Sequence, residues 1–385
     1  MTKSAPSTKP FKVGTNECWL SEILKRIERL DYYVRPVKLN ALKLDSNENF
    51  VLNKEFISKV VMEAVQETDL REYPLEQFDN LYAQLAKWIG IDEKYIAVGN
   101  GSDQIIELLL SVIGKDRTTT VFTPTFSYFL NRCELHSIQV DRVPLNRDFA
   151  LNKTVFLKSA VKSDLVYICS PNNPTGNQFD KQTVIEIIES LGARNKERSK
   201  VSGGGKLILI DEAYVDFADY SMAEYATRHD NGDCSVIVLR TMSKAFGLAG
   251  ARVGYMITNQ KFSQLFRSAI QSPYPVSSLS LSIATHALMN SSHVVKTIEI
   301  IRQERKRMFD TLSGIKAIRT FRSDANFLFI AAGKRYDAIL KALWRQRIAV
   351  KRLGAIAEYR GCMRVTIGTK EMNDSFLRCV EGAEQ

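Results

Sequence analysis

Short runs of aliphatic and β-branched residues alternate with helix-length segments along most of this chain. Such runs predict buried strands, and the long connections between them predict βαβ units with a mostly parallel sheet covered by helices on both faces. The candidate strands are Thr120–Phe122, Asp164–Cys169, Lys206–Asp211, Ser235–Arg240 and Arg252–Ile257. Because such sheets bind ligands at the carboxyl ends of their strands, the polar clusters that follow these runs are the places to look for a site.

Beyond residue 285 the pattern predicts a smaller unit. A long helix is predicted over residues 293–312, followed by strands near 326–331 and 362–367. Apolar residues at helical spacing predict a helix over 18–30, and residues 195–205, which end in three glycines, predict a flexible surface loop. The length of 385 residues gives room for two or three domains. The expected parts are an N-terminal arm and helix over 1–45 that pack on the small domain and a partner, a large domain over 46–285 and a small domain over 286–385.

The composition, 45% hydrophobic and 25% charged, is that of a folded globular protein and excludes a wholly disordered chain. No apolar run reaches the ~18 residues of a membrane span, and the first residues lack the apolar core of a secretory signal. We therefore expect a soluble, cytoplasmic protein. The net charge of +10 does not indicate nucleic-acid binding, because basic and acidic residues are mixed, as in 301–308. An enzyme that acts on anionic metabolites agrees equally well with this charge.

The six cysteines and four histidines are scattered along the chain. Structural zinc sites need clustered ligands, and disulfide scaffolds are short and rich in cysteine. We expect reduced cysteines and no metal site.

One lysine stands directly after a predicted buried strand. Lys244 follows Arg240-Thr-Met-Ser and precedes a glycine-containing stretch that ends at Arg252. An amine in an apolar setting near other cations has a lowered pKa and can form a Schiff base with a carbonyl compound. Thr241, Ser243 and Arg252 carry donors that suit a phosphate group. Taken alone, the motif favours the other interpretation, a surface lysine beside a glycine turn.

Asp211 ends another hydrophobic run. Its carboxylate can pair with the ring nitrogen of a cofactor, or it can cap the turn that follows. Tyr214, three residues on, can bond a phenolic oxygen of the same ring. Asn173, within Ser-Pro-Asn-Asn-Pro-Thr-Gly, can donate to that oxygen too, although such a run is also an ordinary turn.

Two further clusters allow both a binding and a structural interpretation. Residues 99–103, Gly-Asn-Gly-Ser-Asp, precede a helical stretch over 104–112, and the amides at a helix N-terminus bind phosphate. Phe126 can stack on a planar ring or pack in the core.

Taken together and in this order, these clusters resemble the fold-type I pyridoxal-phosphate aminotransferases and, more narrowly, the histidinol-phosphate aminotransferase family. The resemblance covers about residues 40 to 370 and implies an α/β fold in which a large domain with a mostly parallel sheet carries a smaller α/β C-terminal domain. The motifs are Lys43–Asn49, Tyr73–Pro74, Gly99–Asp103, Thr123–Phe126, Ser170–Gly176, Asp211–Tyr214, Leu239–Gly254, Ser272–Pro275, Ala325–Phe327 and Met363–Thr369.

The resemblance implies a role for each matching residue. Lys244 would hold pyridoxal 5'-phosphate and move the proton, with Asp211 on the ring nitrogen and Tyr214 on the ring oxygen. The implied cofactor contacts are Ser102, Asp103, Phe126, Asn173, Asp211, Tyr214, Thr241, Ser243, Lys244, Arg252 and, across a homodimer interface, Tyr73. The implied substrate contacts are Asn47, Tyr33, Lys351, Arg352 and Arg364.

Three positions depart from the family pattern. Phe50 stands where a proline is usual, and Gln104 takes a glutamate position. A second phosphate-contacting arginine is expected where this chain has Lys351, and either Lys351 or the neighbouring Arg352 can replace it.

The resemblance implies a transfer of the amino group between L-histidinol phosphate and 2-oxoglutarate, giving glutamate, in histidine biosynthesis. Two related enzymes share nearly all the motifs. An aromatic aminotransferase would use Arg364 for the α-carboxylate, and a threonine-phosphate decarboxylase of cobamide synthesis would release CO₂ at the same lysine. A non-enzymatic scaffold of the same fold is the remaining alternative, and the intact Lys244 and Asp211 argue against it.

Overall fold

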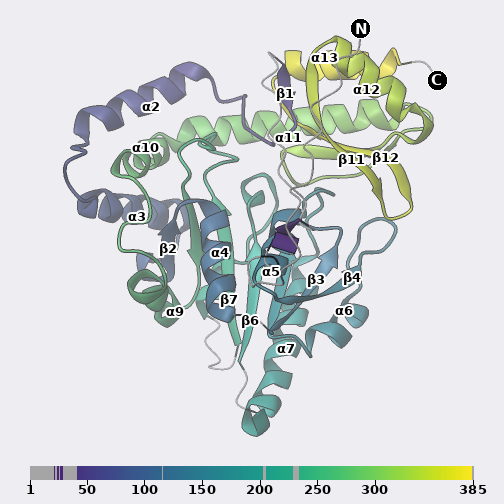
Figure 1. Ribbon diagram of the computed structural model, residues 1–385. Coiled ribbons are helices and arrows are strands. Elements are labelled where there is room, and N and C mark those ends of the chain that lie inside the picture. Colours follow the sequence, from purple (N-terminus) through teal and green to yellow (C-terminus); the bar gives the residue numbers. More distant parts are fainter. Residues whose placement is uncertain are drawn as a thin grey trace.

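A seven-stranded sheet forms the centre of the larger part of the molecule in this computed structural model (Figure 1). The structure describes residues 21, 24, 25, 27, 28, 41–114, 116–202, 205–228 and 234–383. Tyr33 and most of the predicted 18–30 helix lie outside these residues. None of the helices within the described ranges is both long and apolar enough to cross a membrane.

The strands of this sheet follow the order β2-β8-β7-β6-β5-β3-β4. All neighbours pair in parallel except β8, which is antiparallel to both β7 and β2. The link between β7 and β8 contains no helix, and so it cannot make the crossover that a parallel pair needs. The predicted mostly parallel sheet is therefore confirmed. Its strands are β2 Ile96–Gly99, β3 Thr118–Thr123, β4 Gln139–Pro144, β5 Leu165–Cys169, β6 Lys206–Asp211, β7 Cys234–Thr241 and β8 Gly254–Ile257.

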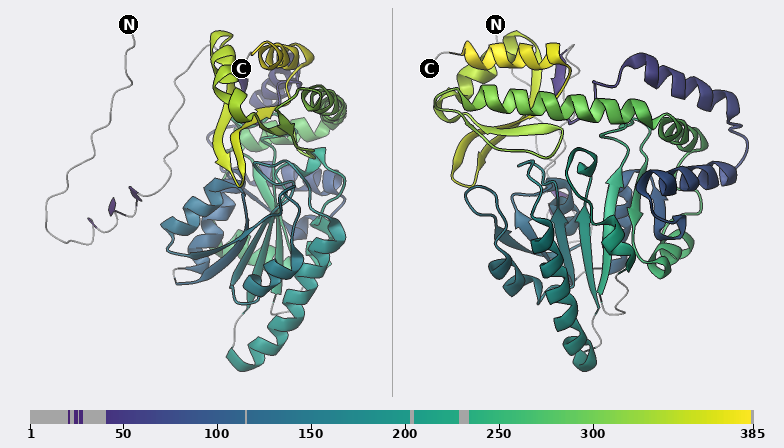
Figure 2. Two further views of the ribbon diagram at one scale, coloured as in Figure 1. Left: turned by 90° about the vertical axis from the view of Figure 1, so that its right-hand side faces the viewer. Right: turned by 180° about the vertical axis from the view of Figure 1, so that it is seen from behind.

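Helices cover both faces of this sheet, as the two views in Figure 2 show. Alternate residues of β6 explain why: Leu209 belongs to one hydrophobic cluster, while Ile208 and Ile210 belong to the other. A strand buried on both faces is apolar throughout, which is the pattern seen in the sequence. The helices of this part are α2 Lys54–Glu67, α3 Leu75–Ile89, α4 Gly101–Ile113, α5 Ser127–Leu135, α6 Lys153–Ala160, α7 Lys181–Ser202, α8 Ala223–Arg228, α9 Gln260–Leu265 and α10 Ser278–Met289.

A second, five-stranded sheet has the order β1-β11-β12-β10-β9. It is antiparallel except where β1 joins β11 in parallel. Its strands are β1 Leu42–Leu44, β9 Arg319–Thr320, β10 Phe327–Ala331, β11 Ile348–Ile356 and β12 Tyr359–Thr366, and its helices are α12 Tyr336–Arg345 and α13 Lys370–Glu381. Because β1 belongs to this sheet, the chain crosses from the smaller sheet to the larger one between β1 and β2. The domain limits 1–45, 46–285 and 286–385 remain a prediction.

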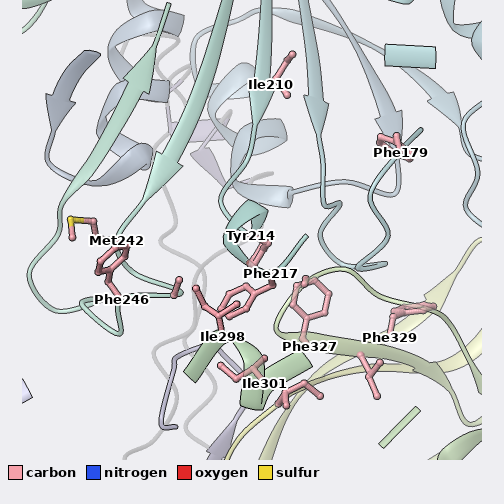
Figure 3. Close-up of a cluster of buried hydrophobic side chains, with 14 of the residues drawn as sticks. Phe179, Ile210, Tyr214, Phe217, Met242, Phe246, Ile298, Ile301, Phe327 and Phe329 are labelled. Atoms are coloured by element: carbon pink, nitrogen blue, oxygen red, sulfur yellow. The ribbon is translucent and has the colours of Figure 1, made fainter. Parts of the chain in front are cut away.

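The long helix α11, Ser291–Ser313, joins the two parts. Figure 3 shows Ile298 and Ile301 of α11 beside Phe217 from the larger part and Phe327 from β10. All four side chains are nearly or fully buried. The hydrophobic core is therefore continuous beneath the region where the two sheets meet.

The predicted surface loop over 195–205 is wrong for most of its length, because α7 continues to Ser202. Residues 195–200, Asn-Lys-Glu-Arg-Ser-Lys, contain no proline, glycine or β-branched residue, and four of them are strong helix formers. The glycines that suggested a loop begin only after the helix has ended.

The strand β8 approaches the first turn of α4 so closely that only glycine fits. A Cβ on Gly254 would lie 2.2 Å from the Ser102 amide nitrogen, and a Cβ on Gly101 would lie 2.6 Å from Arg252 Nη2. Gly101 also has a φ of +74°, which side chains rarely adopt. These two glycines bring the start of α4 and Arg252 together.

We predict that Gly254→Ala lowers the free energy of unfolding by about 1–3 kcal/mol, since the backbone must move to admit the methyl group. Gly250→Ala is the matched control, because a Cβ there meets nothing within 4 Å. Its effect should stay within about 0.5 kcal/mol. Urea denaturation of the two variants checks the prediction, and equal stabilities would contradict it.

Candidate active site

A cavity opens at the carboxyl ends of the parallel strands β5, β6 and β7. It is lined by Ser102, Asp103, Phe126, Cys169, Asn173, Asp211, Ala213, Tyr214, Thr241, Ser243, Lys244, Ala249 and Arg252. Every cofactor contact inferred from the sequence lies here except Tyr73. Cys169, Ala213 and Ala249 were not predicted, because their small side chains carry no distinctive motif.

One end of the cavity carries groups that can donate hydrogen bonds to an anion. The 13-residue helix α4 begins there, so that Ser102 and Asp103 lie in its first turn. Thr241 Oγ1 donates to Ser243 Oγ at 2.9 Å, and Arg252 Nη2 lies 3.0 Å from Asp103 Oδ2. A helix N-terminus, two hydroxyls and a guanidinium form the donor set that phosphate prefers.

Lys244 brings a reactive amine into the same cavity. Its Nζ donates to the Ser46 carbonyl at 3.0 Å and lies 5.7 Å from the centre of the Tyr214 ring. Burial and, as a smaller cause, the positive charge of Arg364 lower the pKa of Lys244 to about 8. A substantial fraction of the amine is therefore neutral, and hence nucleophilic, near pH 8.

Asp211 is a buried carboxylate at the end of β6. Its Oδ2 accepts from the Tyr167 hydroxyl at 2.7 Å, and its Oδ1 accepts from the Ala213 amide at 3.1 Å. Burial raises the pKa of Asp211 to about 6, while these two hydrogen bonds oppose the rise. Among the described residues Asp211 has no basic partner in an ion pair. An ionised carboxylate in this setting suits a protonated ring nitrogen.

Tyr214 and Asn173 place hydrogen-bonding groups on the cavity wall. The Tyr214 hydroxyl accepts from Asn47 Nδ2 at 2.9 Å and from Asn173 Nδ2 at 3.4 Å. Since both amides donate, the phenol keeps its own proton for an oxygen atom of a ligand. Burial raises the pKa of Tyr214 to about 12, so that it stays neutral at physiological pH.

Arg364, on β12, is a buried cation beside this wall. Its Nη1 donates to Asn173 Oδ1 at 2.6 Å and its Nη2 to the Asp45 carbonyl at 2.8 Å, while its Nε has no partner. None of the carboxylates that the structure describes forms an ion pair with it. The charge of Asp45 opposes the lowering of the pKa of Arg364 by burial, but it makes no ion pair with the guanidinium. A buried guanidinium without a direct ion pair is expected to bind an anion, because an unpaired charge is costly to bury.

The strand register separates the two basic residues of β11. Lys351 lies directly opposite Arg364, and Arg352 lies opposite Met363. Opposed residues of an antiparallel pair share one face of the sheet. Lys351 is therefore on the face of Arg364. Arg352 is on the other face, where its charge acts on Tyr336 of α12.

The segment 45–47, which follows β1, contacts Tyr214 and Lys244 of the cavity and the neighbouring Arg364. The Asn47 amide donates to Thr366 Oγ1 at 3.0 Å, and the Asn47 carbonyl accepts from Asn326 Nδ2 at 3.0 Å. Asn47 is thus held by the smaller part of the molecule while its side chain contacts Tyr214 in the larger part. The backbone carbonyls of Asp45 and Ser46, which contact Arg364 and Lys244, could not be inferred from side-chain motifs.

Tyr73 lies outside the cavity. It is 74% exposed, and its ring stacks on Tyr274 with 4.5 Å between the ring centres. Within one chain Tyr73 is therefore not part of the cavity lining.

The donor set of the cavity fits pyridoxal phosphate. The donor groups at one end suit its phosphate, and the amine of Lys244 suits its aldehyde. The Asp211 carboxylate suits the ring nitrogen, and the hydroxyl of Tyr214 suits the ring oxygen. Phe126 on the wall provides an aromatic face.

Comparison with known proteins agrees with this chemistry. Residues 40–380 match the family described as aminotransferase class I and II. A histidinol-phosphate aminotransferase of Pyrococcus furiosus is 32% identical over 88% of this chain and 91% of its own length. A histidinol-phosphate aminotransferase of Caldanaerobacter subterraneus is 31% identical over 88% of this chain and 92% of its own.

The fold has counterparts among solved structures as well. The histidinol-phosphate aminotransferase of Sinorhizobium meliloti, in complex with pyridoxal 5'-phosphate, superposes with a TM-score of 0.78 at 22% identity. The match covers 93% of this chain and 97% of that structure, and it confirms the expected fold. The chain belongs to the class I and II aminotransferases and, within them, to the histidinol-phosphate aminotransferase family.

Proposed function

We propose that this chain is a pyridoxal-phosphate-dependent aminotransferase that exchanges the amino group between L-histidinol phosphate and 2-oxoglutarate, a step of histidine biosynthesis. The observation that carries the proposal is the cavity in which Lys244, Asp211 and the anion-binding end of α4 meet. The relatives at about 30% identity support the choice of substrate.

Each wall of the cavity has a part in holding the cofactor. Ser102, Thr241, Ser243 and Arg252 would hold its phosphate, while Asp211 would keep the ring nitrogen protonated. Tyr214 and Asn173 would bind the ring oxygen, and Phe126 would lie against the ring. When bound, pyridoxal phosphate supplies an electron sink for the pair of electrons released at the substrate α-carbon.

Lys244 is the only lysine among the cavity-lining residues of the described chain. We assign to its Nζ both the covalent attachment of the cofactor and the transfer of the proton at the substrate α-carbon. A pKa near 8 suits this work, because such an amine can both take up and release a proton near neutral pH. Segment 45–47 would cover the reacting atoms and exclude water.

The two cations on one face of the smaller sheet favour a phosphorylated substrate. Lys351 and Arg364 can together bind a dianion, with the planar guanidinium providing two parallel donors. Aromatic amino acids, the runner-up substrates, carry only a single carboxylate for Arg364. A threonine-phosphate decarboxylase would need both cations as well. The two cations therefore do not distinguish this enzyme from the proposed aminotransferase, and an activity assay has to do so. Asn47 would contact the same substrate, since its side chain already contacts Tyr214 on the cavity wall. Tyr33 remains a proposed contact from outside the described residues.

A homodimer is part of the proposal. Tyr73 and Tyr274 form an exposed aromatic pair, and Leu70 and Leu75 beside Tyr73 are 72% and 65% exposed. Exposed apolar residues gathered in this way are typical of an interface. We propose that the Tyr73 hydroxyl reaches the cofactor phosphate in the partner subunit.

The five described cysteines are free, which suits the reducing cytoplasm.

The function is tested by offering purified enzyme, loaded with pyridoxal phosphate, several amino donors with 2-oxoglutarate as acceptor. We expect L-histidinol phosphate to have the highest kcat/KM, and L-phenylalanine to follow well below it. Release of CO₂ from L-threonine phosphate, without formation of glutamate, would instead establish the decarboxylase. If none of the donors reacts, the interpretation of the chain as a non-enzymatic scaffold would remain.

We predict that the rate of covalent cofactor uptake by the apoenzyme rises with pH about a midpoint near 8, because only the neutral amine attacks the aldehyde. Arg364→Leu should move this midpoint upward, since it removes a positive charge that lowers the pKa of Lys244. Stopped-flow absorbance measures the rate. A midpoint near the ordinary value of 10.5 would contradict the burial argument.

We predict that Lys351→Met raises KM for L-histidinol phosphate by about tenfold or more, the effect of losing a hydrogen bond to a charged group. Arg352→Met is the matched control on the opposite face of β11 and should change KM less than about twofold. The two variants should have the same KM for unphosphorylated L-histidinol. A larger loss for Arg352→Met than for Lys351→Met would overturn the assignment.

A further inference from the structure

Tyr167 is a buried polar residue that the mechanism above does not use. It lies in the middle of β5, is 1% exposed, and stacks on Phe129 of α5 with 3.8 Å between nearly parallel rings. Its hydroxyl is 2.7 Å from Asp211 Oδ2 on the neighbouring strand. From the sequence alone, Tyr167 is one more apolar residue of a buried strand.

The direction of this hydrogen bond is fixed by chemistry. An ionised carboxylate only accepts, so the Tyr167 hydroxyl must donate. The Ala213 amide donates to the other oxygen, so each oxygen of Asp211 has one donor. The stacked ring leaves Tyr167 little freedom to turn away, and the carboxylate is held between two fixed donors.

We infer that Tyr167 is a positioning residue for catalysis: its hydroxyl holds the Asp211 carboxylate ionised and oriented toward the ring nitrogen of the cofactor. This inference rests on the proposed function, because it assumes that pyridoxal phosphate occupies the cavity. Tyr167 does not line the cavity and acts only through Asp211.

The neighbours of Asp211 show why such a donor is needed. Burial is the main cause that raises the pKa of Asp211 to about 6, and the negative charges of Asp103 on α4 and Glu212 act in the same direction. Cys169 on β5 and Tyr214 also interact with Asp211, and burial keeps both neutral by raising their pKa values. Lys244 and Arg252 are the basic residues that line the same cavity. Of the groups that stabilise the ionised form, Tyr167 provides the largest contribution and the Ala213 amide the next.

Removal of the hydroxyl therefore has a predictable sign. In Tyr167→Phe the pKa of Asp211 rises above about 6, so that more of the carboxylate is protonated at pH 6 to 7. Only the ionised form pairs with a protonated ring nitrogen. The loss of cofactor affinity should be greatest at low pH and should disappear where Asp211 is ionised in both proteins.

The test measures equilibrium binding of pyridoxal phosphate to the apoproteins between pH 5.5 and 9. We expect Tyr167→Phe to bind about tenfold more weakly than the wild type at pH 6 and equally at pH 9. In the loaded enzyme kcat should fall, with KM for 2-oxoglutarate changed less than about twofold. Tyr82→Phe is the control. It removes a buried hydroxyl that accepts from the Val98 amide, far from Asp211, and its binding profile should match the wild type.

A constant ratio of affinities across this pH range would show that Tyr167 is merely structural and would overturn the inference. If Tyr167→Phe does not fold, 3-fluorotyrosine at position 167 replaces it. This residue is a stronger donor and should move the wild-type profile to lower pH, and an unmoved profile again refutes the inference. If the wild type itself binds no pyridoxal phosphate, the proposed function fails, which is a distinguishable result.

Discussion

The parallel pairing of β5, β6 and β7 is the constraint on which the site depends. Cys169 at the end of β5 lies opposite Asp211 at the end of β6, and Asp211 lies opposite Leu239 of β7. Because the three strands run the same way, the loops that follow them leave the sheet at one edge. Asn173, Tyr214 and Lys244 are carried by these loops and so meet above the same cavity. Their distance along the sequence does not matter once this register is set.

Burial then gives the charged groups of the cavity their chemistry. The same loss of water lowers the pKa of Lys244 to about 8 and raises that of Asp211 to about 6. Between these two values the amine is partly neutral while the carboxylate is mostly ionised. That combination is the one required for attack on an aldehyde beside a protonated ring nitrogen. Burial thus connects the packing of the parallel sheet to the proposed reaction.

Much of the site could be predicted because its residues stand in local motifs. Lys244, Asp211 and Arg252 each follow or flank a buried strand, and the parallel-sheet rule places such residues together. Tyr167 escaped prediction because nothing in the sequence distinguishes it from a core aromatic residue. Its role depends on the pairing of β5 with β6.

Other limits of prediction have equally specific causes. The choice between Lys351 and Arg352 depends on strand register, which a single sequence does not reveal, and the pairing of β11 with β12 decides which of them faces Arg364. The three glycines that end the segment 195–205 predict a loop there, but the helix-forming residues before them continue α7 to Ser202. Tyr73 needs a partner subunit, so a single chain does not test its role.

The most direct test of the central claim is to map the cofactor attachment. The holoenzyme would be reduced with borohydride, digested and analysed by mass spectrometry. The account predicts one phosphopyridoxyl group per chain, attached to Lys244, and none in Lys244→Ala. Attachment at another lysine, or no attachment in a folded wild-type protein, would contradict it.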